Sequence, residues 1–232
     1  MSSKRTYVSK IATTVLLAGL GTGVGSALAY EAGDLILRAG VASVQPDEDS
    51  STLEINGTGA VGTSAGVGNS DQLGLTLTYM LAPNWGIGVL AATPFEHDIT
   101  AHGVTSASID AGEAKQLPPT VTLQYFPMDS SSAFQPYVGV GINYTIFFSE
   151  DVDSDLETAI GASGDLELDD SIGLAAQVGF DYALNEHWVL NASVWYLDID
   201  TEATFKFDNG TRIEADVDVD PWVYMIGLGY VF

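Results

Sequence analysis

The sequence predicts an all-β protein, an eight-stranded antiparallel transmembrane β-barrel with extended extracellular hairpins. Three observations lead to this fold class. Several segments alternate large apolar residues with small or polar ones, as between Leu73 and Leu81, and a period of two is typical of β-strands. The connectors between these segments are alternately short and long. The chain also ends at Phe232, directly after an aromatic alternating strand, which resembles the signal that outer-membrane barrels present to their assembly machinery.

Residues 1–29 have the pattern of a cleaved signal peptide. Three cations form a basic start, the apolar stretch "IATTVLLAGL" follows, and Ala27 and Ala29 form a cleavage site of small residues before Tyr30. The apolar stretch is too short for a membrane-spanning helix, and glycines interrupt the residues after it. We therefore expect residues 1–29 to be removed and residues 30–232 to form a single outer-membrane barrel domain.

The charge of the mature chain excludes some functions. Residues 1–29 contain three of the seven cations and none of the 31 acidic residues, so the formal charge of residues 30–232 is −27. Nucleic acid is not an expected partner, because binding it requires a basic surface. Cysteine is absent, so disulfides and thiol chemistry do not contribute. No H-E-x-x-H or P-loop motif occurs, and we expect neither enzymatic activity nor a cofactor.

Eight segments have the alternation of strands. In chain order they lie at about residues 34–45, 71–81, 85–99, 117–126, 136–149, 171–183, 188–207 and 211–232. Large apolar and aromatic residues on one face oppose Gly, Thr, Asn and Gln on the other, which suits a barrel with lipid outside and a tight polar interior. A soluble β-sandwich shows the same alternation with the faces exchanged.

The connector lengths distinguish these two folds. The connectors after the second, fourth and sixth strands are short or moderate, whereas those after the first, third and fifth are long, acidic and rich in Gly and Ser. Short turns on one side and long loops on the other are typical of outer-membrane barrels. We therefore expect the protein in the outer membrane of a Gram-negative bacterium, with the long loops outside the cell.

The last two strands exchange their apolar positions part of the way along. Even-numbered residues are apolar up to Tyr196 and again from Trp222, whereas between them the even residues are acidic and the odd ones apolar. If Phe207 pairs with Thr211, both strands switch at one height, where the surroundings outside the barrel change from lipid to water. The hairpin then extends beyond the bilayer and lines the lumen with an apolar set: Leu197, Ile199, Phe205, Phe207, Ile213, Val217 and Val219. This set either forms an apolar channel or packs together as a plug, because small barrels allow both.

Three prolines fall on two neighbouring strands. Pro94 interrupts the third strand, and Pro118 and Pro119 begin the fourth. Proline cannot donate a hydrogen bond to a sheet and is confined to edges and bulges. We interpret these prolines as a local opening of the barrel wall from the lumen to the membrane. The alternative is that they lie at strand ends above the bilayer and only begin a loop.

Charged residues inside the barrel are few. Arg38 occupies an inward position of the first strand, and we expect it to pair with an inward carboxylate such as Asp181. His97 and His102 lie near acidic residues but lack the spacing of a metal site, so no metal site is predicted. The acidic stretch that begins at Asp151 lacks the Gly and Glu that a calcium-binding loop requires.

Long blocks of the sequence resemble the OmpW family of small outer-membrane proteins, most closely its OprG branch. The blocks include "NWGIGVLAATPFEHDI", "LPPTVTLQYF", "PYVGVGINYTIFF", "IGLAAQVGFDYALNEHWVLNASVWYLDIDTEA" and "VDPWVYMIGLGYVF", and the resemblance extends over essentially the whole mature chain. It implies an eight-stranded barrel with a narrow hydrophobic channel that opens laterally between strands. The long acidic loops depart from the family pattern.

Two functions follow from these observations. The first is passive uptake of small, mostly hydrophobic molecules through an apolar lumen with a lateral opening into the membrane. The second is a structural or surface-interaction barrel whose acidic loops bind cations or partners. The expected partners are outer-membrane lipids and lipopolysaccharide, the outer-membrane assembly machinery and small apolar solutes.

Overall fold

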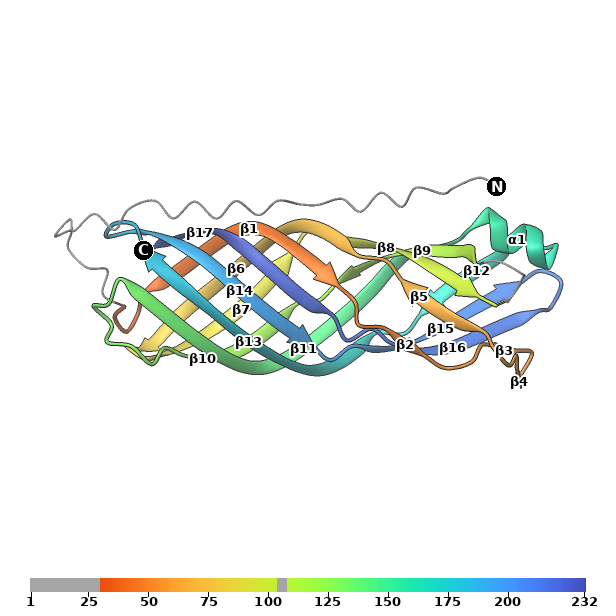
Figure 1. The fold of residues 1–232 in the computed structure, drawn as a ribbon, viewed down its shortest axis with the longest axis horizontal. Coiled ribbons are helices and arrows are strands. Elements are labelled where there is room, and N and C mark those ends of the chain that lie inside the picture. Colours follow the sequence, from red (N-terminus) through yellow and green to blue (C-terminus); the bar gives the residue numbers. More distant parts are fainter. Residues whose placement is uncertain (1–29, 104–107) are drawn as a thin grey trace, which may run out of the picture.

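A closed antiparallel barrel of eight strands forms the left-hand part of the molecule in Figure 1. The computed structural model describes residues 30–103 and 108–232, so the predicted signal peptide at residues 1–29 lies outside the described residues. The barrel strands are β1 (Leu35–Gln45), β6 (Ser70–Ala82), β7 (Trp85–Ala92), β10 (Thr120–Tyr125), β11 (Phe134–Val152), β13 (Ser171–Ala183), β14 (Trp188–Leu197) and β17 (Trp222–Val231). Within the described residues, no helix is long and apolar enough to span a membrane.

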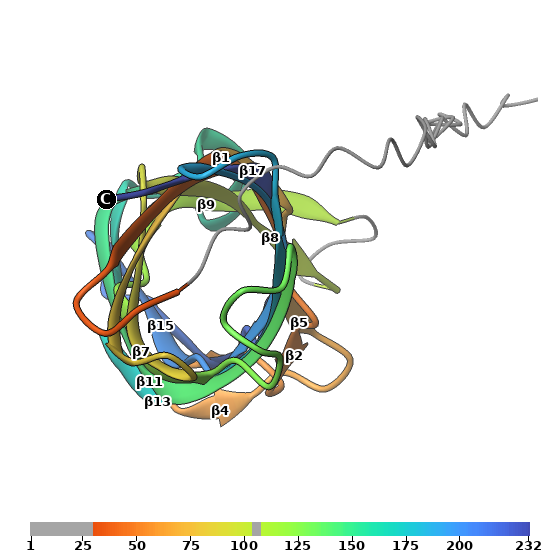
Figure 2. The same ribbon diagram turned by 90° about the vertical axis from the view of Figure 1, so that its left-hand side faces the viewer.

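Each barrel strand pairs with its neighbours in chain order, and β17 returns to pair with β1. Ile36 lies opposite Val231 in this last pairing, and the Phe232 amide donates a hydrogen bond to the Leu35 carbonyl at 2.9 Å. The view along the barrel in Figure 2 shows the resulting ring of strands. Closure satisfies the backbone groups that an open edge would expose to lipid.

Beyond the barrel the wall continues as two sheets, one joined to the barrel through β11 and the other separate from it (Figure 1). One sheet contains β5 (Ser64–Val67), β8 (Phe95–His102), β9 (Ile109–Leu117) and the end of β11. The other contains β2 (Asp49–Ser50), β3 (Glu54–Ile55), β4 (Thr58–Gly59), β12 (Gly164–Leu168), β15 (Asp200–Phe207) and β16 (Arg212–Asp218). A short helix, α1 (Ser154–Ile160), follows β11 at the far end.

These outer elements correct the predicted connectors. Residues 109–116 were expected in a loop but belong to β9, which pairs with both β8 and β11. The predicted loop after the first strand contains β2 to β5, and the loop after the fifth strand contains α1 and β12. Pairing with neighbouring strands imposes extended structure on Gly- and Ala-rich stretches whose own propensity for strands is weak.

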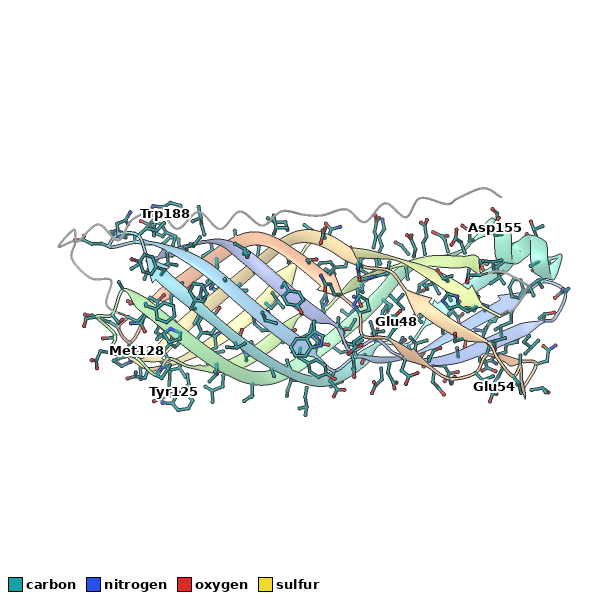
Figure 3. The ribbon with its side chains drawn as sticks, in the orientation of Figure 1. Glu48, Glu54, Tyr125, Met128, Asp155 and Trp188 are labelled. Carbon is teal, nitrogen blue, oxygen red and sulfur yellow. The ribbon has the colours of Figure 1, made fainter. Side chains whose placement is uncertain are left out.

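The outer surface of the barrel is an apolar belt. Leu73, Val140 and Ile226 are between 51% and 68% exposed on its outward face. Aromatic side chains gather at the turn end, where Trp85 packs on Tyr125 and Trp188 packs edge-on against Tyr230 (Figure 3 labels Tyr125 and Trp188). An apolar belt bordered by aromatic rings is the surface that a bilayer requires.

The last hairpin confirms the expected register. Phe207 accepts a hydrogen bond at 2.9 Å from the Gly210 amide, and Gly210 has a φ of +88°, a left-handed conformation that suits glycine at a hairpin turn. Asp200 lies opposite Asp218 in the outer part, and Tyr196 opposite Trp222 in the barrel, so one register extends through both. Each predicted strand is nevertheless two strands, because regular pairing stops at residues 198–199 and 219–221.

Candidate functional site

A buried polar network fills the lower lumen, within the barrel. Arg38 Nη2 lies 2.5 Å from Asp181 Oδ2, and Arg38 Nε donates to Asp181 Oδ1 at 2.9 Å. Tyr30 Oη and Asn191 Nδ2 both donate to the same carboxylate at 2.8 Å. The guanidinium also lies 5.3 Å from the ring centre of Tyr137. The pair expected from the sequence is thus one part of a larger network.

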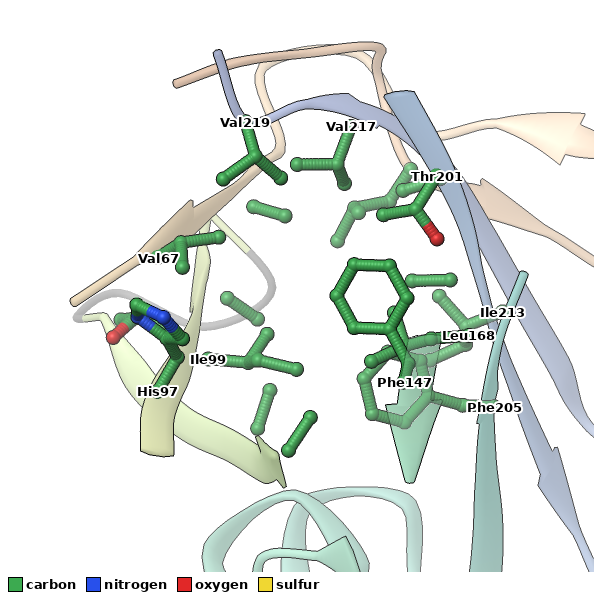
Figure 4. A pocket seen from close by; sticks show the side chains of 18 of the residues that line it. Val67, His97, Ile99, Phe147, Leu168, Thr201, Phe205, Ile213, Val217 and Val219 are labelled. Atoms are coloured by element: carbon green, nitrogen blue, oxygen red, sulfur yellow. The ribbon is translucent and has the colours of Figure 1, made fainter. Parts of the chain in front are cut away.

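The outer part of the lumen is apolar and encloses a cavity of about 50 Å³ (Figure 4). A single water requires about 10 to 15 Å³ on this measure, so the cavity admits only slender groups. Of the seven residues predicted to line a channel, four line the cavity: Phe205, Ile213, Val217 and Val219. The other three, Leu197, Ile199 and Phe207, are buried in the apolar core around it. The hairpin therefore packs together and also borders a narrow hollow.

Much of the cavity wall comes from outside the last hairpin, from the end of the predicted third strand and from segments that were expected to be loops. Ile99 on β8 and Ala111 and Ala114 on β9 face the hairpin residues across the cavity, and Leu156 on α1 also borders it. Phe95, Ile99 and Ala101 fit an alternating apolar pattern, but His97 interrupts it. The residues of β9 that face the cavity, Ala111 and Ala114, are too small to give a clear apolar pattern. This weak alternation was the available signal.

The hydrogen-bond ladder is interrupted beside the cavity. β7 pairs with β10 as far as Leu90 and Thr120, and β8 pairs with β9 from Phe95 and Gln116. Between these two pairings lies a gap in the wall. Residues 91–94 are not paired with residues 117–119, all of which the structure describes.

All three predicted prolines lie in this gap. Pro94 and Pro119 are exposed, whereas Pro118 is buried and its carbonyl accepts a hydrogen bond from Thr120 Oγ1 at 2.9 Å. Pro118 and Pro119 separate β9 from β10 and therefore lie within the wall, rather than at the start of a strand as the sequence predicted. Their role as a lateral opening stays a prediction.

The gap lies at the outer edge of the apolar belt. Just inside it, Val89 and Val121 are 39% and 52% exposed on the outward face. Just beyond it, Lys115 and Glu96 form an exposed ion pair with 2.5 Å between Nζ and Oε1. Apolar residues on one side and charged residues on the other locate the gap at the boundary between lipid and water.

Two polar side chains meet at the cavity wall. His97 Nδ1 lies 2.6 Å from the Gly68 carbonyl oxygen, and His97 Nε2 lies 2.9 Å from Gln116 Nε2. Burial lowers the pKa of His97 below 6.5, and this effect outweighs the hydrogen bond to Gly68 and the nearby charge of Asp98, which both raise it. His97 is therefore neutral at pH 7.

Acidic side chains gather on the outward face of the last hairpin. Asp198, Asp200 and Asp220 each place one carboxylate oxygen within 4.8 Å of the other two. Asp220 also accepts a hydrogen bond from Tyr196 Oη at 2.8 Å. Partial burial raises the pKa of Asp200, and the charges of Asp198, Asp218 and Asp220 raise it further.

A closed eight-stranded barrel with an apolar outer belt defines a small outer-membrane β-barrel protein. The family profile of the OmpW family matches residues 31–232, and the chain belongs to that family.

Relatives agree with this assignment. Outer membrane protein W of Vibrio cholerae serotype O1 is 50% identical over 205 residues, which cover 88% of this chain and 91% of that protein. Outer membrane protein W of Escherichia coli K12 is 45% identical over 231 residues, which cover 99% of this chain and 100% of that protein. The crystal structure of the outer membrane protein OprG from Pseudomonas aeruginosa matches with a TM-score of 0.83 and 50% identity, over 88% of this chain and 98% of that one.

These relatives are outer-membrane barrel proteins by name, not enzymes. This chain is likewise an outer-membrane protein of a Gram-negative bacterium, in contact with membrane lipids.

Proposed function

We propose that the protein allows small, mostly hydrophobic molecules to cross the outer membrane passively. A solute enters the apolar outer lumen from outside the cell and leaves sideways into the lipid, through the gap between residues 91–94 and 117–119. The observation that supports this proposal is the position of the apolar cavity, beside a gap in the wall and at the outer edge of the lipid belt.

The chemistry of the lumen favours this route over an axial one. An apolar solute gains about 25 cal/mol for each Å² that it removes from water in the outer lumen. Further inward it meets Arg38, Asp181 and Tyr30, whose hydrogen bonds it would have to break without replacing them. Each buried polar group left unpaired costs about 1 to 3 kcal/mol. The lower lumen therefore opposes an apolar solute.

Uptake into vesicles with an outer leaflet of lipopolysaccharide tests the proposal. Vesicles that contain the protein should take up a radiolabelled hydrocarbon such as toluene faster than vesicles without it. Phe205→Asp, which adds a charge to the cavity wall, should slow that uptake. Glu54→Gln changes an exposed acidic residue of β3 and serves as the control. Equal uptake with and without the protein would refute the proposal.

The same proposal includes two further partners. Lipopolysaccharide surrounds the outer belt, and the assembly machinery binds the C-terminal strand β17 together with Phe232, which follows it and is 68% exposed. Deletion of Phe232 should lower the amount of folded protein in the outer membrane, measured by heat-modifiable migration on gels. An unchanged amount would contradict this role of the terminal residue.

A surface-interaction barrel is the second candidate function. The proximity of Asp198, Asp200 and Asp220 favours it, because carboxylate oxygens are the ligands that divalent cations such as Ca²⁺ prefer. On this alternative Ca²⁺ should raise the melting temperature of the native protein, and Asp200→Asn should abolish the rise. A melting temperature independent of Ca²⁺ would leave transport as the better-supported function.

A further inference from the structure

Gln116 carries an unpaired hydrogen-bond acceptor next to the apolar cavity. Its side chain is 2% exposed, it lines the cavity, and its Oε1 atom is buried without a hydrogen-bond partner among the described residues. A buried carbonyl oxygen without a partner is costly. Four other side-chain atoms of the described residues are also buried without a partner, but none of them belongs to a residue that lines the cavity, so Gln116 alone lies where a group from outside the chain can bind.

The neighbouring histidine determines which way the Gln116 amide points. The Gly68 carbonyl only accepts hydrogen bonds, so His97 Nδ1, 2.6 Å away, must carry a proton. Neutral His97 then has an unprotonated Nε2, which accepts from the Gln116 amide NH₂ group at 2.9 Å. The NH₂ group of Gln116 is thereby engaged, and its carbonyl oxygen is the atom left free.

Gln116 also lies at the gap in the wall. Across β8 and β9 it is opposite Phe95, and this pair is the first one beyond Pro94 and Pro118. Figure 4 shows His97, the hydrogen-bond partner of Gln116, at the cavity beside Val67 and Ile99. A solute that moves from the cavity toward the gap therefore passes Gln116.

We propose that Gln116 Oε1 accepts a hydrogen bond from the solute, and that the preferred solutes are small apolar molecules with one hydroxyl or N–H group. This inference rests on the proposed transport function and specifies its substrate class. The apolar body of such a solute lies in the apolar outer lumen, and its single donor satisfies the buried oxygen. A pure hydrocarbon of the same size leaves that oxygen unpaired.

Phenol and toluene form a suitable pair of probes, because a hydroxyl in one replaces a methyl group in the other. In vesicles with an outer leaflet of lipopolysaccharide, Gln116→Leu should slow phenol uptake about tenfold relative to its effect on toluene, a factor that corresponds to about 1.4 kcal/mol. Gln177→Leu is the matched control. Gln177 also has a buried Oε1 without a partner, but its amide bonds to Thr122 Oγ1 in the barrel, away from the cavity lining. It should change the phenol-to-toluene ratio little.

A binding measurement keeps this inference separate from the transport proposal. In the purified protein, phenol should shift the NMR signals of the Gln116 side-chain amide and of His97 Nε2, and toluene should shift them much less. Gln116→Met should remove the difference if Gln116→Leu does not fold. Uptake of both solutes with an unchanged ratio in Gln116→Leu would overturn the acceptor role alone. Phenol-specific shifts without uptake would support the acceptor and refute transport. Equal shifts for both probes would overturn the acceptor.

Discussion

Burial holds His97 neutral at the cavity wall. The side chain is 6% exposed, and both ring nitrogens have partners, the Gly68 carbonyl and the Gln116 amide. Protonation would place a charge in an apolar surrounding and would turn Nε2 into a donor facing another donor. The protonation state of His97 therefore controls the orientation of the Gln116 amide. That orientation decides which amide atom of Gln116 is left without a partner next to the cavity.

This coupling predicts a pH dependence of stability. The pKa of His97 is lowered in the folded state, so below about pH 6.5 the unfolded chain takes up a proton first. The stabilisation by neutral His97 is present above that pH and is lost as the pH falls toward the folded-state pKa. His97→Gln should reduce the fall in melting temperature between about pH 7.5 and about pH 5.5. The same fall in both proteins would show that other groups cause it.

The hydrogen-bond ladder is interrupted at two places in the wall, in the last hairpin and at the gap, and the two interruptions differ. In the last hairpin the break at residues 219–221 leaves the register intact, and Val219 still donates to the Ile199 carbonyl at 2.8 Å. At the gap, in contrast, the four residues 91–94 face the three residues 117–119, so the register shifts by one residue. The last hairpin therefore stays closed, whereas the gap that contains the prolines is the weak part of the wall.

Replacement of one proline tests this weak part. Pro94→Ala supplies an N–H group that can bond across the gap, with a gain of about 0.5 to 1.5 kcal/mol. The variant should fold in the outer membrane with an equal or higher melting temperature, and it should take up an apolar solute more slowly. Unchanged uptake at matched expression, together with unchanged uptake by Phe205→Asp, would favour the surface-interaction barrel.

At the scale of the whole molecule, one elongated wall passes from lipid into water. Outward residues of β17 such as Leu228 are apolar and 48% exposed, whereas outward residues of β16 such as Asp218 are acidic. The two sheets beyond the barrel enclose the cavity, so the apolar interior lies outside the bilayer and the polar interior within it. As a result, the apolar cavity begins at the outer lipid boundary, where the polar interior of the barrel ends.

The lipid boundary predicts opposite outcomes for the same substitution at two heights. Leu228→Arg should destabilise the barrel by about 2 to 4 kcal/mol if it lies near the middle of the bilayer. Asp218→Arg, on the same face beyond the lipid, should be nearly neutral. Urea unfolding in lipid vesicles measures both. Similar losses at the two positions would contradict the boundary.

The sequence by itself determined the barrel and the register of the last hairpin. Alternation is a local property of each strand, and the acidic switch at Asp198 and Asp220 appears in both strands at matching positions. Arg38 and Asp181 were paired for a similar reason, since an inward charge in a closed lumen needs a partner.

Only the tertiary structure decided how the outer lumen is built. Residues 109–117 carry weak strand propensity and become a strand because β8 and β11 lie on either side of them. Their pairing brings Gln116 against His97, 19 residues earlier, and places α1 at the cavity. These contacts depend on packing between segments that are far apart along the chain, and no local pattern of residues specifies such packing.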